Sequence, residues 1–342
     1  MSKRTTSAVW VRGMAEMLAA EGLDVAKLFA TAGVDPAQIE GPSARLATEK
    51  LSHLWDLAVE RSRNPAIALA QHQVARPASF DVVGYTMMSC PDLRSAFERL
   101  IRYLLILSDA LTMTMTEEAD GSRIDFVLFG GERPIPRQRI EYIFVTVVSF
   151  CRWIVRSEIS PCAVELAFPA PADLLPYRAA FRCPVTFGAE RNSLTFSRAD
   201  LDLKLPTFNP QLAELHERYA GEYLRQFDHA QTSYRVREAI IRKLPDGEPR
   251  RDDVASELHM SERTLQRRLE DEKTSFVQLL DDTRRELADQ YLGRLHLSLA
   301  QAAYLLGFAD QSSFFRACKR WFNLSPGQYR SQLLHGPVTA SS

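Results

Sequence analysis

The spacing of hydrophobic positions changes along the first 227 residues. Up to residue 107 apolar side chains recur every three or four positions, as at Val11, Met14 and Leu18, which predicts helices. At residues 112–116 and 124–128 the period becomes two, which predicts a β-hairpin. Further helices are expected at 137–157, 172–181 and 210–227, with strands at 163–168, 185–187 and 193–196. Residues 1–227 are therefore expected to form one α+β domain.

Three local features of this region are predicted more closely. Thr48 is expected to cap the helix that follows it, because a side-chain oxygen can accept from free N–H groups at a helix start. A single strong helix is expected from Leu93 through Leu107. The strands at 185–187 and 193–196 are expected to pair with each other around Gly188.

From residue 233 onward the pattern is helical throughout, and one structural unit occurs twice. Residues 254–272 and 298–322 each contain a short helix, a tight corner and a second helix, which is the pattern of a helix-turn-helix. In residues 254–272, Ser261 is a natural N-cap for the second helix. In residues 298–322, Gly307 suits the corner between the two helices. A long helix running from Ser275 to Leu292 is expected to join the two units, so 233–335 predicts an all-α domain.

The second helix of each unit has a polar face suited to DNA. Leu265 and Leu269 share one face of the first, and Phe314, Cys318 and Phe322 share one face of the second. The remaining positions hold side chains that read base edges, since Arg pairs with guanine and Gln with adenine. The predicted DNA contacts are Arg263, Thr264, Gln266, Arg267, Gln311, Ser312, Ser313, Phe315, Arg316, Lys319 and Arg320.

The same region resembles the AraC/XylS family of bacterial transcription regulators. The residues that carry the resemblance are Gly307, Phe308, Gln311, Ser312, Phe314, Arg316, Ala317, Cys318, Lys319, Arg320, Ser325, Pro326, Tyr329 and Arg330. Cys318 departs from the pattern, in which a Phe is usual. The resemblance implies a sequence-specific DNA-binding regulator, expected to be an activator, whose partners are double-stranded operator DNA and RNA polymerase.

The first 227 residues resemble the arabinose-binding-domain-like sensing domain of one AraC-type subgroup, which includes regulators of ornithine use and of virulence genes. The residues are Gly84, Tyr85, Ser89, Pro91, Leu104, Leu107, Ser108, Asp109, Cys183–Val185, Phe187, Gly188, Asn192–Leu194, Phe196, Asp200–Asp202, Leu205 and Pro206. The resemblance implies an unknown small-molecule effector and a homodimer. As effector-binding candidates we take Tyr85, Met87, Arg102 and Tyr103, each of which could equally be core or surface.

Length and charge complete the domain prediction. The 342 residues with 46% apolar content predict two or three domains with sizeable cores. We divide the chain into an effector-sensing and dimerisation domain at 1–227, a polar linker at 228–232 and a DNA-binding domain at 233–335. The net charge is only −1, so the DNA-binding prediction depends on where the basic residues lie.

The sequence offers little support for catalysis. The five cysteines form no Cys-x-x-Cys pair, so we expect reduced, mostly buried thiols, no metal site, no cofactor and no catalytic residues. No apolar stretch approaches 18 residues, so no membrane partner is expected and the protein is expected in the cytoplasm. Two alternatives stay open. One is a DNA-repair methyltransferase-type regulator with an AraC-type domain, which needs a zinc-held cysteine, and the other is a DNA-binding regulator without a ligand.

Overall fold

The computed structural model describes residues 4–41, 43–70, 75–130, 133–225, 228–294 and 297–335. The chain divides into two compact units, residues 1–226 and residues 227–342. Residues 228–232, predicted as a linker, instead form the start of helix α11 (Asp228–Lys243). The polar stretch holds neither proline nor glycine, so nothing in it ends a helix.

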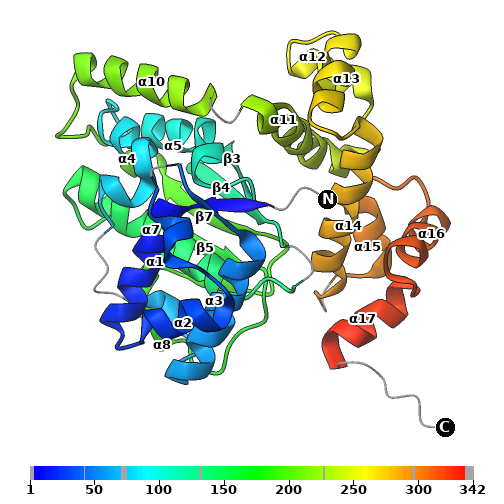
Figure 1. Ribbon diagram of the computed structural model, residues 1–342, viewed down its shortest axis with the longest axis horizontal. Coiled ribbons are helices and arrows are strands. Elements are labelled where there is room, and N and C mark those ends of the chain that lie inside the picture. Colours follow the sequence, from blue (N-terminus) through cyan, green and yellow to red (C-terminus); the bar gives the residue numbers. More distant parts are fainter. Residues whose placement is uncertain are drawn as a thin grey trace. The chain divides into compact units, whose positions relative to one another are not determined.

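The N-terminal unit is built on a five-stranded sheet in the order β3-β4-β7-β5-β6 (Figure 1). The strands are β3 (Leu111–Glu118), β4 (Gly121–Leu128), β5 (Ala163–Leu166), β6 (Val185–Phe187) and β7 (Asn192–Ser197). The predicted hairpin is confirmed as β3 and β4, which pair from Leu111↔Leu128 to Glu118↔Gly121. The sheet therefore combines one local hairpin with strands that come from distant parts of the chain.

The predicted pairing of β6 with β7 is wrong. Each of them instead flanks β5, with Val164 opposite Val185 on one side and Leu194 on the other. Val164 and Leu166 are fully buried, as expected of a strand with a neighbour on each edge. The intervening strand was not visible in the local pattern around Gly188, because pairing between distant segments leaves no local signal.

Helices cover one face of this sheet. The ring of Phe97 on α5 (Leu93–Arg102) lies 5.3 Å from that of Phe196, and Phe144 on α7 (Gln138–Val155) lies 4.9 Å from Phe126. The predicted helix 93–107 is broken at Tyr103, whose buried ring lies between α5 and α6 (Leu104–Leu107). The apolar side chains of the sheet and of α7 thus form one continuous core.

The remaining elements of this unit pack around α7 and the sheet. They are β1 (Thr5–Ser7), α1 (Ala8–Ala20), α2 (Val25–Ala32), η1 (Pro36–Ile39), β2 (Arg45–Ala47), α3 (Thr48–Ser62), η2 (Ile67–Leu69), η3 (Pro77–Phe80), α4 (Asp81–Met88), α8 (Leu175–Phe181), α9 (Arg198–Leu201) and α10 (Pro210–Arg225). Apolar side chains of α1, α2 and α3 form a second cluster that reaches Tyr142. Thr48 is not a cap, since Ala47 holds that position and the Thr48 hydroxyl is buried without a hydrogen-bond partner.

The C-terminal unit is helical in its described part, as predicted. After α11 it contains η4 (Leu244–Asp246), α12 (Arg251–Glu257), α13 (Glu262–Asp271), α14 (Phe276–Leu292), α15 (Leu299–Leu305), α16 (Gln311–Phe322) and α17 (Pro326–His335). α12 with α13 and α15 with α16 form the two helix-turn-helix units, and α14 is the predicted joining helix. Within the described residues no helix of either unit is long and apolar enough to cross a membrane.

Candidate DNA-binding interface

The first helix-turn-helix is held by one buried face of α13. Leu265 and Leu269 on this face are at most 1% exposed, as is Val254 on α12. The helix begins where predicted, because the Ser261 hydroxyl accepts a hydrogen bond from the Thr264 N–H at 3.2 Å. The opposite face of α13 is left to solvent. Arg263, Gln266, Arg267 and Arg268 are exposed there, and Thr264 is half-buried.

The second helix-turn-helix repeats this arrangement on α16. The Asp310 carboxylate accepts from the Ser313 N–H at 2.8 Å and begins the helix. Phe314 and Cys318 are fully buried, as predicted, and burial raises the pKa of the Cys318 thiol to about 12. Phe322 is only half-buried and stacks on Tyr329 with ring centres 3.9 Å apart. The exposed face carries Gln311, Ser312, Phe315, Arg316, Lys319 and Arg320, with Ser313 half-buried beside them.

Arg284 on α14 connects the two helix-turn-helix units. Its guanidinium donates to the carbonyls of Leu306 at 2.8 Å and Gly307 at 2.6 Å, which lie at the corner of the second unit. It also pairs at 3.0 Å with Glu248, which precedes the first unit. A buried, three-way hydrogen-bonded arginine of this kind fixes the position of every group it contacts.

Gly307 allows the corner of the second helix-turn-helix to pack against the turn at Gly247, which precedes the first helix-turn-helix. The Gly307 backbone has φ +66°, and a Cβ there would lie 2.6 Å from the Gly247 carbonyl oxygen. Only glycine permits both this left-handed conformation and this approach. The two helix-turn-helix units are therefore packed directly together within residues 244–322, and the orientation of α13 relative to α16 is fixed.

The predicted DNA contacts differ in how far they are already engaged within the protein. Among the described residues, the side chains of Arg263, Arg267 and Lys319 make no hydrogen bond or ion pair, and the same holds for Gln311 and Ser312. These groups are available to a ligand.

Other predicted contacts have an internal partner. Gln266 donates to Glu270 at 2.9 Å, and Arg316 donates to the Ser313 hydroxyl at 2.9 Å. Arg320 pairs with Asp281 on α14, which also accepts from the Trp321 indole at 3.0 Å. Arg320 therefore helps hold α16 against α14 while part of its side chain stays in solvent.

Sequence reasoning missed two exposed residues of the helix-turn-helix units. Arg268 follows Arg267 on α13, and Tyr304 on α15 is 66% exposed. The sequence did carry a signal for each of them. Arg268 is the second of two consecutive arginines, and Tyr304 is a tyrosine on the polar side of the first helix of a helix-turn-helix. Both side chains can donate to phosphate oxygens, which position a protein on DNA without reading sequence.

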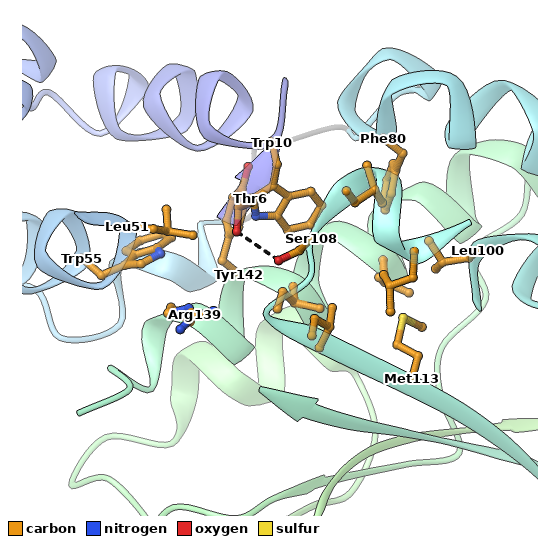
Figure 2. Close-up of a pocket in the computed structure, with 15 residues that line it drawn as sticks. Thr6, Trp10, Leu51, Trp55, Phe80, Leu100, Ser108, Met113, Arg139 and Tyr142 are labelled. Carbon is orange, nitrogen blue, oxygen red and sulfur yellow. Dashed lines mark hydrogen bonds between the residues drawn. The ribbon is translucent and has the colours of Figure 1, made fainter. Parts of the chain in front are cut away.

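The N-terminal unit holds a cavity of about 40 Å³ between α7, α3, α6 and β3 (Figure 2). Its lining is mainly aromatic and aliphatic, and it includes the hydroxyls of Thr6 and Ser108, which are hydrogen-bonded at 3.1 Å, and the guanidinium of Arg139. The residues that line it are Thr6, Trp10, Leu51, Trp55, Phe80, Leu100, Leu104, Leu107, Ser108, Leu111, Met113, Arg139, Tyr142, Ile143 and Val147.

The four effector-binding candidates from the sequence lie elsewhere. Tyr85 is 42% exposed and Met87 is 1% exposed, and neither lines the cavity. Arg102 pairs at 2.8 Å with Glu217 on α10, and the Tyr103 hydroxyl lies 3.4 Å from the Glu217 carbonyl. Arg139 was missed, although a cation spaced with Tyr142, Ile143 and Val147 on one apolar helix face was a usable signal.

Two packed helix-turn-helix units with solvent-facing polar second helices define a DNA-binding protein. Residues 22–205 match the family described as the arabinose-binding domain of AraC transcription regulators, and residues 254–332 match a helix-turn-helix domain family. The chain belongs to the AraC family of transcription regulators and is a DNA-binding regulator.

Relatives agree over most of the chain. It is 26% identical to the ornithine utilization regulator of Pseudomonas aeruginosa, over 94% of this chain and 95% of that protein. It is 30% identical to the transcriptional regulator VirS of Mycobacterium tuberculosis, over 70% of this chain and 71% of that protein. The crystal structure of the transcriptional regulator CdpR from Pseudomonas aeruginosa is similar with a TM-score of 0.44 and 22% identity, covering 89% of this chain and 96% of that one.

Proposed function

We propose that the protein is a ligand-responsive transcription activator that reads two adjacent major-groove segments per subunit. The observation that carries this proposal is the fixed pair α13 and α16, each with an exposed polar face. Two recognition helices presented from one body reach successive major grooves when they are about one helical turn of DNA, or roughly 10 bp, apart. DNA contacts are assigned to the eleven residues predicted from the sequence, with Arg268 and Tyr304 added as phosphate contacts.

Within this set we assign base reading first to the side chains without an internal partner. Arg267 and Arg263 on α13 and Gln311 on α16 can each form a bidentate pair with a base edge. Phe315, 38% exposed, supplies an apolar surface of the kind that contacts a thymine methyl group. Arg320 is assigned to phosphate, because its ion pair with Asp281 holds it to the protein.

Selection of bound duplexes from a random pool with the full chain tests this function. We expect two conserved half-sites about 10 bp apart. Arg267→Ala should weaken specific binding by about 1–3 kcal/mol and relax the preference at one base position. The matched control Arg61→Ala, on α3 of the other unit, should leave both the affinity and the selected sequence unchanged. Enrichment of no sequence at all, or of a single half-site, would contradict the reading of two segments.

We propose residues 1–227 as the effector-sensing domain, with the cavity of Figure 2 as its ligand site. A concave, mainly apolar space with a few polar groups is the usual form of a small-molecule site. This cavity supports ligand response over the ligand-independent alternative. The surface around Tyr85 and Arg102 is occupied in part by contacts with α10, which makes it the weaker candidate.

We propose that the protein acts as a homodimer through α10. Leu212, Leu215 and Tyr219 follow one another at helical spacing and are 45%, 48% and 56% exposed. An apolar stripe of this spacing is suited to packing against a second copy of the same helix. Leu215→Glu should convert a dimer to a monomer in light scattering. An unchanged mass for this variant would place any dimer contact elsewhere.

The remaining roles follow from this proposal. A DNA-bound activator acts in the cytoplasm of a bacterium and contacts RNA polymerase there. We propose no chemistry by the protein itself, since burial raises the pKa of the Cys90 thiol to about 12 and that of Cys183 to about 11. Thiols of such high pKa are poor nucleophiles. Cys162 is exposed, but among the described residues it belongs to no group of side chains that could hold the zinc that the alkyl-transfer alternative needs. Transfer of a methyl group from alkylated DNA to any cysteine would overturn this part.

A further inference from the structure

Arg139 is a buried cation that pairs with no carboxylate among the described residues. It projects from α7 into the cavity, and the whole residue is 4% exposed. Its Nη1 donates to the Phe129 carbonyl at 3.1 Å and lies 3.5 Å from the Ser52 hydroxyl. No other hydrogen bond and no ion pair involves its side chain in the part of the chain that the structure describes. Most of the donor capacity of the guanidinium is therefore unused.

Leaving a guanidinium in this state is costly. A charge removed from water needs an opposite charge or several hydrogen bonds to offset the loss of hydration. Burial alone lowers the pKa of Arg139, to about 10, so the group still carries its charge at neutral pH. Arg284, which is buried to a similar degree, is by contrast satisfied by two carbonyls and Glu248.

The rest of the cavity limits what an anion bound there can be. Among the described residues that line it there is no Asp or Glu, so a ligand ammonium group meets no opposite charge there. The ring of Tyr142 lies between those of Trp10 and Trp55, with ring centres 5.2 and 5.4 Å away, and Leu111 and Met113 line the cavity from β3. The other polar groups of the lining include the hydroxyl pair of Thr6 and Ser108 and the Tyr142 hydroxyl, none of which is a cation or an anion.

We propose that this cavity binds a small monocarboxylate that has an apolar body and no ammonium group, with its carboxylate paired to Arg139. Guanidinium and carboxylate groups match in a bidentate geometry, and the pair is strong where water is excluded. The cavity of about 40 Å³ takes the carboxylate and its first carbons. A longer body displaces flexible side chains, of which Met113 is the most adaptable. This inference rests on the proposed ligand response and names the class of ligand.

Direct binding to the full chain tests the proposal with three probes of equal chain length. These are hexanoate, 1-hexanol and norleucine, which present a carboxylate, no charge, and a carboxylate with an ammonium group. Binding is read from the fluorescence of Trp10 and Trp55, which line the cavity. We expect hexanoate to bind at least about tenfold more tightly than hexanol, which corresponds to one bidentate charge-assisted contact. Norleucine should bind more weakly than hexanoate.

Variants assign the preference to Arg139. Arg139→Met should bind hexanoate and hexanol equally. Arg139→Lys should retain a reduced preference for hexanoate, because lysine keeps the positive charge but cannot make the bidentate contact of a guanidinium. Arg137→Met is the matched control, since Arg137 is the N-cap residue of the same helix, two residues earlier, and pairs with Glu141 instead. It should keep the full preference. Equal binding of hexanoate and hexanol by the unmodified chain would overturn the proposal without any variant, as would an unchanged preference in Arg139→Met.

DNA binding measured with each probe separates this inference from the proposed function. Hexanoate that binds the cavity but leaves both DNA affinity and transcription unchanged would support the site and contradict ligand response. A transcriptional response to a different class of metabolite, with no preference for hexanoate in the binding assay, would do the reverse.

Discussion

At the scale of single residues, two neighbouring charges on α7 show how burial and partners decide stability. Arg137 is partly exposed and pairs with Glu141 at 3.3 Å, whereas Arg139 is buried without an acid. Arg137 stabilises the fold because it compensates the charge of the buried Glu141 carboxylate. Arg139, by this argument, lowers the stability of the ligand-free protein, which is typical of a residue that serves binding.

The same substitution at these two positions should therefore have opposite effects. Arg139→Met should raise the free energy of unfolding by about 1–3 kcal/mol, because methionine fills the space without an unpaired charge. Arg137→Met should lower it at pH 8, because the Glu141 carboxylate loses its partner. Urea unfolding of the ligand-free protein measures both. A loss of stability in Arg139→Met would show that its bond to the Phe129 carbonyl is its main role.

Glu141 gives a pH-dependent prediction. Its side chain is fully buried and accepts from the Tyr177 hydroxyl, and its Oε2 has no hydrogen-bond partner. Burial raises the pKa of Glu141 from 4.5 to about 7, against the opposing effects of Tyr177 and Arg137. Between these values the folded protein holds a proton that the unfolded chain has released. The contribution of Glu141 to stability therefore falls as the pH rises from 4.5 to 7 and stays low above that.

Glu141→Gln removes this titration. Relative to the unmodified protein, the variant should gain about 2–3 kcal/mol between pH 4.5 and pH 7.5, following the size of the pKa change. Unfolding curves at several pH values give the difference directly. Parallel stability profiles for the two proteins would mean that Glu141 is charged in the folded state throughout this range.

At the scale of elements, what could be predicted from the sequence was set by local chemistry. Helix starts were found because capping residues lie next to the helix they begin. Ser298 with Gln301 and Ser325 with Gln328 form reciprocal capping boxes, while the Ser275 hydroxyl accepts from the Gln278 N–H. The helix-turn-helix pair and its exposed residues followed from these signals together with the hydrophobic spacing.

Features that depend on distant segments were not predictable in this way. The position of β5 between β6 and β7 depends on pairing across the sheet. The cavity brings together Thr6, Leu51, Leu111 and Arg139 from four separate elements. Tyr85 and Arg102 were chosen for their chemistry alone, and the fold directs them toward α10. No local pattern encodes which side chains will meet around such a space.

Gly307 gives the prediction that belongs to this scale. Gly307→Ala should destabilise the C-terminal unit by about 1–3 kcal/mol, because the added Cβ meets the Gly247 carbonyl and the backbone has φ +66°. It should also weaken protection of one half-site more than the other in footprinting, since the corner sets the position of α16. Gly327→Ala is the matched control, because a Cβ there meets nothing within 4 Å. Equal stability for the two alanine variants would show that the corner can relax.

At the scale of the whole molecule, the chain divides into two units, and our proposal assigns DNA reading to one and ligand sensing to the other. The C-terminal unit has its own core, in which Val236, Ala239 and Ile240 of α11 are fully buried. Glu272 accepts from the backbone N–H groups of Thr232 and Ser233, so α11 belongs to this unit from its early residues. A fragment should therefore begin at Asp228 rather than at residue 233, where the sequence placed the domain.

The fragment 228–342 should bind the selected DNA without responding to any ligand of the intact protein. A ligand shifts DNA binding only if it binds the active and inactive arrangements with different affinity, and the fragment lacks the cavity where that difference is proposed to arise. Its affinity for a single site should be lower than that of the full chain if α10 supplies the dimer contact. Gel-shift titrations with and without hexanoate, on both proteins, measure the response and the affinity together. A fragment that responds as the full chain does would place the sensor in the C-terminal unit and remove the role proposed for Arg139.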